Sequence, residues 1–248
     1  MNEKKQIPQY LKVKRYILSR LRDGRLRPHD KLLAERELSD LLTVNRNTIR
    51  HAFGILEQEG RIYRSGRKGW FASGARLVVD PSREYVNFDK LARLQGFLPA
   101  WNVQESGATP ATGELQELFE TEEGTPLYYV FETGSLDGQL VYYSECFFLA
   151  SVCPGFLPKI VTLPMTDVLR EDYGIHLFQK GLLIRPLGMA PQVTALLNLP
   201  ARSPGLFFRR VKTSQTGQVV QVDYEYWRAD SIEMRSAFTG ATNQTPGT

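Results

Sequence analysis

A three-residue turn between two short amphipathic segments constrains the fold of this chain more than any other feature. Residues 34–42 and 46–59 each place apolar side chains at helical spacing. In the turn between them, residues 43–45, Asn45 has a side chain suited to cap the second helix, and Gly60 supplies the stop at that helix's far end. Two helices joined across so short a turn predict a helix-turn-helix unit.

Two neighbouring elements extend this unit. Residues 8–23 carry a helical apolar stripe that ends at Gly24. Residues 61–64 and 70–72 are predicted to form short strands on either side of a basic tip bounded by glycines. A hairpin in this place is a wing, able to lie along or in the minor groove of DNA. We therefore expect a winged helix-turn-helix domain over residues 1–74.

The charge of the chain is divided in the same way. Residues 1–74 contain 17 Lys and Arg against 8 Asp and Glu, a balance of +9, and the rest contains 14 against 19, a balance of −5, which together give the +4 of the whole chain. A basic third joined to an acidic remainder predicts one part that meets a polyanion and one that does not. The alternative is a chance excess of surface lysine and arginine.

Composition excludes several classes of protein. No run of 18 or more apolar residues occurs, and the N-terminus lacks the apolar segment of a secretory signal. Cys146 and Cys153 are too few for a disulfide framework or a Cys-rich zinc site. We expect a cytoplasmic protein with no membrane partner, no metal and no cofactor.

The start of the second helix in the helix-turn-helix concentrates side chains that contact bases and phosphates. Arginine makes bidentate contacts to guanine and asparagine to adenine, and the amino end of such a recognition helix is the part that meets base edges. These side chains belong to Asn45, Arg46, Asn47, Thr48 and Arg50. Lys68 in the wing tip adds a cation for the DNA backbone. The alternative is an ordinary polar face of a surface helix.

Residues 8–72 resemble the winged helix of the GntR family of bacterial repressors. The matching segments are Glu35-Arg36-Glu37-Leu38, Val44-Asn45-Arg46, Thr48-Ile49-Arg50, residues 56–60 and residues 66–71. The resemblance implies that Arg36 and the polar start of the recognition helix contact DNA, and that Gly66 is the wing glycine. Two positions depart from the family pattern: its usual Pro-Ser is replaced by residues 33–34, Leu-Ala, and its connector glycine is His29.

The remainder of the chain contains an internal repeat. Residues 114–148 and 193–227 share the order helix, X-Pro, strand, Gly-Gln turn and strand, about 79 residues apart. Between the copies, residues 165–173 are predicted to form a helix ended by Gly174. The arrangement predicts an α+β domain in which an antiparallel sheet carries its helices on one face.

Three segments of the second region, residues 168–175, 197–200 and 226–230, fit a known pattern. On these segments, residues 93–236 resemble the UTRA effector domain of the HutC branch of GntR regulators. Residues 7–11, 67–71 and 225–228 extend the resemblance to repressors of phosphonate uptake. The resemblance implies a chorismate lyase-like fold that binds an effector and dimerises, with residues 75–92 as the linker and residues 237–248 as a disordered tail.

The residues that bind phosphate in many members of this family are replaced here. Glu132 and Gly134 stand where arginines are usual, and Pro164 stands where a serine often opens a helix, so a plain sugar phosphate is disfavoured. The remaining charges suit a zwitterion, with carboxylates for an ammonium group and arginine for an anionic end. The predicted effector-binding residues are Glu132, Glu145, Arg209, Asp223 and Glu225. The alternative is that they are rim charges on a solvated sheet face.

These features predict a transcriptional repressor that binds an inverted-repeat operator on double-stranded DNA as a homodimer and is released by a small effector such as an aminophosphonate. A sugar, a sugar phosphate, or a carboxylic or amino acid is the alternative effector. An enzyme is the rival class for the second domain, but the sequence contains no nucleophile–base constellation, metal-ligand spacing or phosphate-cradling loop. The aromatic residues of the predicted strands are expected to form core rather than a ligand cage.

Overall fold

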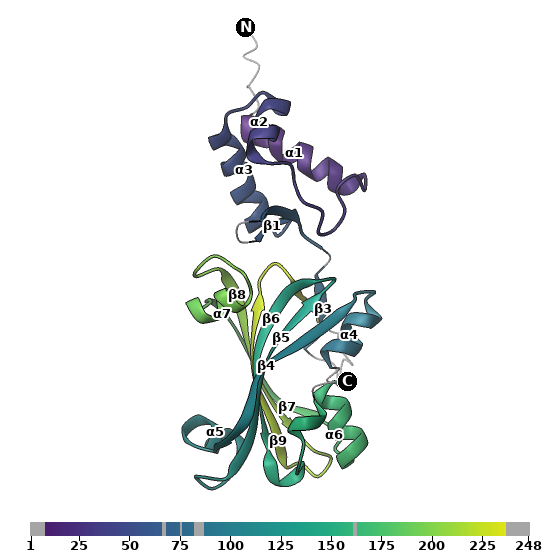
Figure 1. The fold of residues 1–248 in the computed structure, drawn as a ribbon, viewed down its shortest axis with the longest axis vertical. Coiled ribbons are helices and arrows are strands. Elements are labelled where there is room, and N and C mark those ends of the chain that lie inside the picture. The colour runs from purple at the N-terminus through teal and green to yellow at the C-terminus, as the bar shows by residue number, and fades with distance from the viewer. Residues whose placement is uncertain (1–7, 66–67, 75, 82–86, 161–162, 237–248) are drawn as a thin grey trace, which may run out of the picture.

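The computed structural model describes residues 8–65, 68–74, 76–81, 87–160 and 163–236, which form two domains stacked along the long axis of the molecule (Figure 1). Gly66 and the predicted tail, residues 237–248, lie outside the described residues. The N-terminal domain is mostly helical, and the larger C-terminal domain is built on a six-stranded sheet.

The N-terminal domain has the predicted order of three helices and a hairpin. Its elements are α1 (Gln9–Arg22), α2 (Glu35–Leu42), α3 (Arg46–Gln58), β1 (Ile62–Ser65) and β2 (Gly69–Ala72). The apolar faces of the three helices close on one another, and Val13, Leu38, Ile49 and Phe53 are completely buried between them. Packing of these amphipathic faces, rather than local propensity, stabilises helices this short.

Two backbone positions give the helix-turn-helix its shape. Thr43 takes the left-handed conformation, with φ 53°, that ends α2. Asn45 Oδ1 accepts a hydrogen bond from the Thr48 N–H at 2.8 Å and caps α3, as the sequence predicts. His29, at the position where the sequence resemblance leads us to expect glycine, also has a left-handed backbone, with φ 67°. The backbone conformation typical of glycine is therefore kept, although histidine adopts it less readily.

The C-terminal domain contains the predicted duplication, with one further strand in each copy. Its elements are β3 (Leu77–Val79), α4 (Phe88–Leu94), β4 (Pro99–Pro110), α5 (Gly113–Phe119), β5 (Pro126–Leu136), β6 (Gln139–Leu149), η1 (Ala150–Val152), η2 (Leu157–Lys159), α6 (Met165–Tyr173), β7 (Phe178–Gly188), α7 (Pro191–Leu196), β8 (Pro204–Thr213), β9 (Val219–Arg228) and β10 (Ile232–Met234). The sheet is antiparallel in the order β4-β5-β6-β9-β8-β7. Each copy of the repeat is therefore strand, helix, strand, strand, and β6 and β9 join the copies at the centre.

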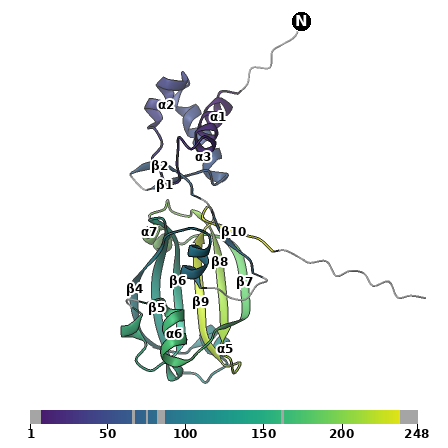
Figure 2. The same cartoon turned by 90° about the vertical axis from the view of Figure 1, so that its right-hand side faces the viewer.

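The helices cover both faces of this sheet, so the prediction that they pack on one face is wrong (Figures 1 and 2). α4 and α6 pack on the face that includes Tyr142 and Phe148 of β6. α5 and α7 pack on the face that includes Tyr143 and Phe147 of the same strand. Because neighbouring residues of a strand point to opposite faces, a strand that is apolar at successive positions needs cover on both.

Two elements lie in the range that the sequence assigns to a linker. β3 pairs in parallel with β10, and Ala92 of α4 is completely buried against the sheet. Asn87 caps α4 by accepting a hydrogen bond from the Lys90 N–H at 2.8 Å. These residues therefore belong to the packed body of the C-terminal domain.

Candidate functional site

The exposed start of α3 forms the candidate DNA-binding surface. Arg46, Asn47 and Arg50 are exposed, and the Arg50 Nε donates to Glu35 Oε2 of α2 at 2.7 Å. Asn45 is also exposed, but its Oδ1 is occupied by the hydrogen bonds from Thr48 that cap the helix. Arginine and asparagine side chains thus project from the first turns of a helix whose orientation is fixed by its cap and by α2.

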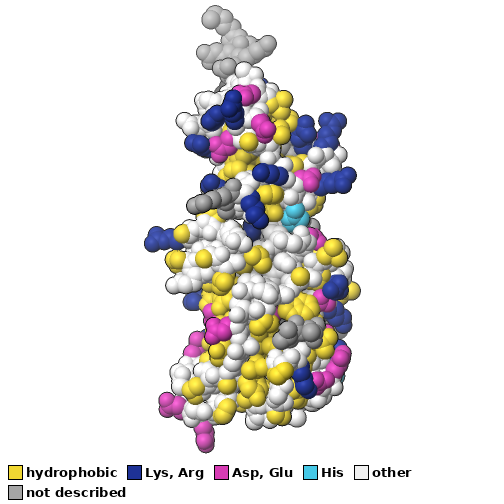
Figure 3. All heavy atoms as spheres, viewed as in Figure 1, with side chains coloured by type: hydrophobic (Ala, Val, Ile, Leu, Met, Phe, Trp, Pro, Cys, Tyr) yellow, Lys and Arg dark blue, Asp and Glu magenta, His cyan; other side chains and the backbone are white. Residues whose placement is uncertain are grey.

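The second helix and the wing add cations beside this surface. Arg36 on α2 and Lys68 at the wing are both exposed, whereas Gly66 falls outside the described residues. Figure 3 shows Lys and Arg side chains over much of the N-terminal domain. A surface with this charge attracts the phosphate backbone of nucleic acid without reading its sequence.

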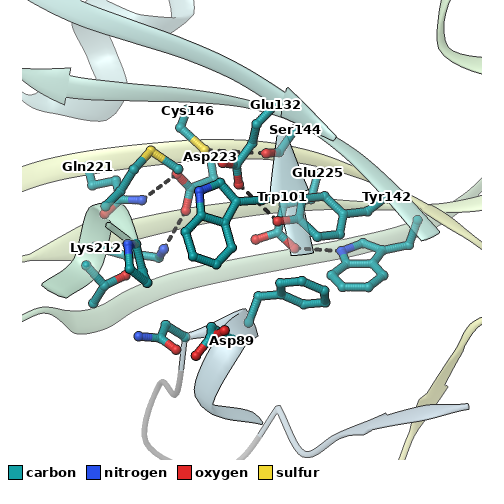
Figure 4. A pocket seen from close by; sticks show the side chains of 16 residues that line it. Asp89, Trp101, Glu132, Tyr142, Ser144, Cys146, Lys212, Gln221, Asp223 and Glu225 are labelled. Carbon is teal, nitrogen blue, oxygen red and sulfur yellow. Dashed lines mark hydrogen bonds and ion pairs between the residues drawn. The ribbon is translucent and has the colours of Figure 1, made fainter. Parts of the chain in front are cut away.

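A cavity of about 80 Å³ lies on the α4 and α6 face of the sheet (Figure 4). The polar and charged groups that line it come mainly from β5, β6, β8 and β9, and aromatic rings close its sides. The lining includes Phe88, Asp89, Trp101, Glu132, Tyr142, Ser144, Thr166, Lys212, Gln221, Asp223, Glu225 and Trp227. Polar groups converging in a largely apolar hollow are typical of a small-molecule site.

Ion pairs engage two of the carboxylates in this cavity. Asp223 and Lys212, exposed by 2% and 1%, are paired at 2.6 Å, and the Gln221 Nε2 donates to Asp223 Oδ1 at 2.7 Å. Glu225 accepts from the Arg210 Nε at 2.8 Å and from the Trp227 Nε1 at 2.7 Å. Buried charges persist in a fold when they are paired and hydrogen-bonded in this way.

Glu132 has a different environment from the two paired carboxylates. Its side chain is buried and accepts a hydrogen bond from the Tyr142 hydroxyl at 2.9 Å. Burial raises the pKa of Glu132 to about 7, with the negative charges of Asp223 and Glu225 acting in the same direction and the Tyr142 hydrogen bond and Lys212 acting against it. This carboxyl therefore gains or loses its proton close to neutral pH.

Two of the five predicted effector-binding residues do not lie in the cavity. Glu132, Asp223 and Glu225 line it, whereas Glu145 and Arg209 do not and point to the opposite face of the sheet. Arg209 is ion-paired there with Glu114 of α5. Placing Glu145 and Arg209 in one site with the other three was wrong, because a shift of one residue along a strand moves a side chain to the other face.

Several cavity residues were not predicted. Gln221 and Trp227 follow from Asp223 and Glu225 by the period of two along β9, and Lys212 stands opposite Gln221 in the register of β8 and β9. Gln221 and Trp227 could have been found by extending the alternation along β9 in both directions, whereas Lys212 requires the register between the two strands. Trp101 comes from β4, a strand for which the sequence analysis gave no prediction.

The opposite face of the sheet carries a row of aromatic rings between α5 and α7, which we call the aromatic face. Consecutive rings lie 4.9 to 6.2 Å apart between their centroids, and most are partly exposed. The row consists of Tyr129, Phe131, Phe147, Tyr224, Phe207 and Tyr226. None of these rings lines the cavity. Among the aromatic residues of residues 128–148, which the sequence predicts to be core, Tyr142 lines it.

A contact between the two domains lies at the end of β9. The Arg228 guanidinium lies 5.0 Å from the centre of the Tyr63 ring of β1. Asp230 holds Arg228 in place with two hydrogen bonds, of 2.9 and 2.7 Å, and Arg228 is only 4% exposed. A strand that lines the cavity therefore also contacts the DNA-binding domain.

Comparison with known proteins assigns both domains. Residues 9–72 match the family model for bacterial regulatory proteins of the gntR family, and residues 94–233 match the UTRA domain. The chain is 33% identical over 215 residues to YihL, an uncharacterized HTH-type transcriptional regulator of Escherichia coli K12, covering 86% of this chain and 91% of YihL. It is 37% identical over 71 residues to the arabinose metabolism transcriptional repressor of Geobacillus stearothermophilus, or 29% of this chain and 20% of that one.

The crystal structure of PhnF from Mycobacterium smegmatis has the same fold. It superposes with a TM-score of 0.65 at 22% identity and covers 92% of this chain and 100% of its own. A winged helix joined to a UTRA domain defines a transcriptional regulator. The chain belongs to the GntR family of bacterial regulatory proteins and carries a UTRA domain.

Among the described residues, no helix has both the length and the apolar character needed to cross a membrane. Within the same ranges, no group of three or more His, Cys, Asp or Glu side chains is placed to hold a metal ion.

Proposed function

We propose that this chain represses transcription in the cytoplasm by binding an inverted-repeat operator as a homodimer, and that an effector bound in the sheet cavity lowers its affinity for that operator. The observation that carries DNA binding is the exposed row of Arg46, Asn47 and Arg50 at the capped start of α3. Arginine and asparagine match base edges in the major groove. Lys68 on the wing suits the phosphate backbone, which positions a protein without reading sequence.

The homodimer is supported by the number of bases that one helix can read and by the aromatic face. A single recognition helix contacts only a few base pairs, so a specific operator needs two half-sites related by twofold symmetry. Aromatic residues are enriched at protein–protein contacts, and the aromatic face lies on the side of the sheet away from the cavity. A dimer formed there leaves the cavity accessible to a ligand.

The size of the cavity favours a small effector. A cavity of about 150 Å³ can hold one benzene molecule, so a cavity of about 80 Å³ suits only a small ligand. An aminoethylphosphonate, with seven non-hydrogen atoms, requires a modest opening of the cavity, and its anionic end would suit the first turn of α6, which lines the cavity and has no side-chain cap. A sugar, a sugar phosphate, or a carboxylic or amino acid is the alternative, and a hexose phosphate requires a larger opening.

Selection from randomised DNA, followed by gel shifts, tests the proposed function. We expect the full chain to enrich an inverted repeat and to sediment as a dimer on it. An effector has to bind saturably and to lower operator affinity. Sedimentation of a monomer on the operator would refute the dimer, and turnover of a bound compound without any change in DNA affinity would favour an enzyme.

A further inference from the structure

The Tyr142 ring of the cavity occupies the space that a side chain at Gly134 would fill. It faces Tyr142 in the register of β5 and β6, and a Cβ built on it would lie 1.9 Å from Tyr142 Cε1. Its φ is not in the left-handed region, so the requirement is for space and not for backbone freedom. Any larger residue at position 134 would force the Tyr142 ring away.

The Tyr142 side chain in turn forms a hydrogen bond with Glu132. Tyr142 and Glu132 lie on the same face of the sheet, and the Tyr142 hydroxyl donates to Glu132 Oε1 at 2.9 Å. Glu132 is 6% exposed, so its position depends on this hydrogen bond rather than on solvent. Gly134, Tyr142 and Glu132 therefore form one unit.

Glu132 differs in charge balance from the other carboxylates around the cavity. Asp223 is paired with Lys212, Glu225 with Arg210, and Asp89 with Arg93. In the part of the chain that the structure describes, Glu132 has no such pair and is held by a neutral hydroxyl. A buried carboxylate in this state attracts a cation that the ligand can supply.

A second acceptor in the cavity lacks a donor. The Gln221 Nε2 donates to Asp223, but the Gln221 Oε1 is buried and no group of the described residues hydrogen-bonds to it. Gln221 lies on β9 and Glu132 on β5, and β6 separates these two strands. A ligand that satisfies both acceptors therefore needs two separate donor groups. Buried acceptors of this kind are satisfied in most proteins, by protein or by bound molecules.

We propose that the cavity selects its effector by a protonated amino group, which donates to Glu132, while a second donor of the same molecule bonds to the Gln221 Oε1. Gly134 and Tyr142 set this specificity because they hold Glu132 in place. The inference rests on the proposed function and narrows its effector to a small amine with a second hydrogen-bond donor, such as an amino alcohol or an aminophosphonate that retains one proton. Ligands without an amino group, sugar phosphates included, are excluded.

Two matched pairs of probes test the amino group directly. Ethanolamine is compared with ethylene glycol by calorimetry on the full chain at pH 8, and 2-aminoethylphosphonate with 2-hydroxyethylphosphonate at pH 7, where part of each phosphonate still keeps its second proton. Within each pair only the amine is exchanged for a hydroxyl. We expect the amine to bind roughly 10- to 100-fold more tightly, the value of one charge-assisted hydrogen bond. Equal or tighter binding of the hydroxyl compound would overturn the inference, as would tight binding of glucose 6-phosphate.

Substitutions assign the effect to the unit. Glu132→Gln is expected to remove the preference for the amine within each pair, and Glu145→Gln, on the opposite face, to leave it unchanged. Gly134→Ala is expected to displace the Tyr142 ring and to weaken binding of the amine probes. Gly181→Ala on β7 is its control, because the Cβ there meets its nearest neighbour at 3.7 Å. Should Gly134→Ala not fold, Tyr142→Phe keeps the ring and removes only the donor.

The pH profile separates specificity from a structural effect. Amine affinity should rise as the pH passes through about 7, where Glu132 ionises. In Tyr142→Phe the rise should move to higher pH, because the lost hydrogen bond favours the ionised form. Besides Tyr142, five other titratable side chains line the cavity around Glu132, and three of them, Lys212, Asp223 and Glu225, shift its pKa. The remaining two are Asp89 and Cys146. An unchanged profile in Tyr142→Phe and in Glu132→Gln would overturn the role of this unit.

The failure of this inference differs from the failure of the proposed function. If none of the four probes binds while the full chain still binds a selected operator, the cavity is not an ammonium site and the regulator remains. If the full chain binds no operator, the proposed function itself fails, whatever the cavity binds.

Discussion

Removing one partner of the Lys212–Asp223 pair should destabilise the C-terminal domain strongly. The pair is 2.6 Å long, with side chains exposed by 1% and 2%, so neither charge can be solvated when the other is lost. Lys212→Met preserves most of the length and apolar surface of the side chain while deleting the ammonium group. In this variant the Asp223 carboxylate loses its ammonium partner and keeps the hydrogen bond from Gln221 Nε2.

The expected loss follows from burial. Breaking a buried ion pair by removing one partner costs about 3–5 kcal/mol. Because Gln221 still donates to Asp223, we expect a value near the lower limit, about 3 kcal/mol, which changes the ratio of folded to unfolded protein by roughly 100-fold. The double variant Lys212→Met/Asp223→Leu leaves no unpaired charge and should recover most of the lost stability.

Urea unfolding followed by the fluorescence of Trp101 and Trp227 reports on this domain, because both rings line the cavity. The control is Lys159→Met, which breaks a pair of 2.7 Å whose side chains are 43% and 41% exposed, and which should cost no more than about 1 kcal/mol. A loss below about 1 kcal/mol in Lys212→Met, or a double variant no more stable than the single one, would refute the reasoning.

Four further outcomes are expected. Arg46→Ala should abolish the preference for operator over random DNA, at a cost of about 1–3 kcal/mol per lost base contact. Lys68→Ala should weaken binding to all DNA sequences alike and lower the slope of log affinity against log salt concentration by about one. Gel shifts at several salt concentrations would show both effects. Burial raises the pKa of Glu132 from 4.5 to about 7, so the folded state binds more protons than the unfolded state between these two pH values. The free energy of unfolding should therefore fall as the pH rises from 4.5 to about 7. Thermal unfolding of Glu132→Gln should show a weaker dependence on pH in this range. Tyr63→Leu should leave effector binding intact in calorimetry but reduce its effect on operator affinity.

The winged helix was predictable almost to the residue because its signals are local. Asn45 caps α3 through a hydrogen bond to a residue only three positions away, and Gly60 ends that helix with a left-handed φ of 63°. The duplicated unit was predictable for the same reason, since Pro126 and Pro204 open corresponding strands, β5 and β8, in the two copies. Signals of this kind do not depend on what the element packs against.

The rest of the C-terminal domain depends on contacts that are distant in sequence. β4 and β7 are the edge strands of the sheet and contain residues that disfavour strands, among them Gly107 and Pro186. They form because a neighbouring strand supplies the hydrogen bonds. Glu145 stands opposite Tyr224, and Cys146 opposite Asp223, so the face on which each carboxylate lies was decided by a register that no local pattern fixes.

The same register makes one strand both line the cavity and contact the N-terminal domain. Asp223, Glu225 and Trp227 of β9 line the cavity, and the next residue, Arg228, contacts Tyr63. A ligand changes DNA affinity only by the difference in its binding to two arrangements, and couplings of about 1–3 kcal/mol are typical. A cation–π contact contributes about 0.5–2 kcal/mol. The free energy of this contact is thus comparable in size to the coupling that the proposed release of the operator by an effector requires.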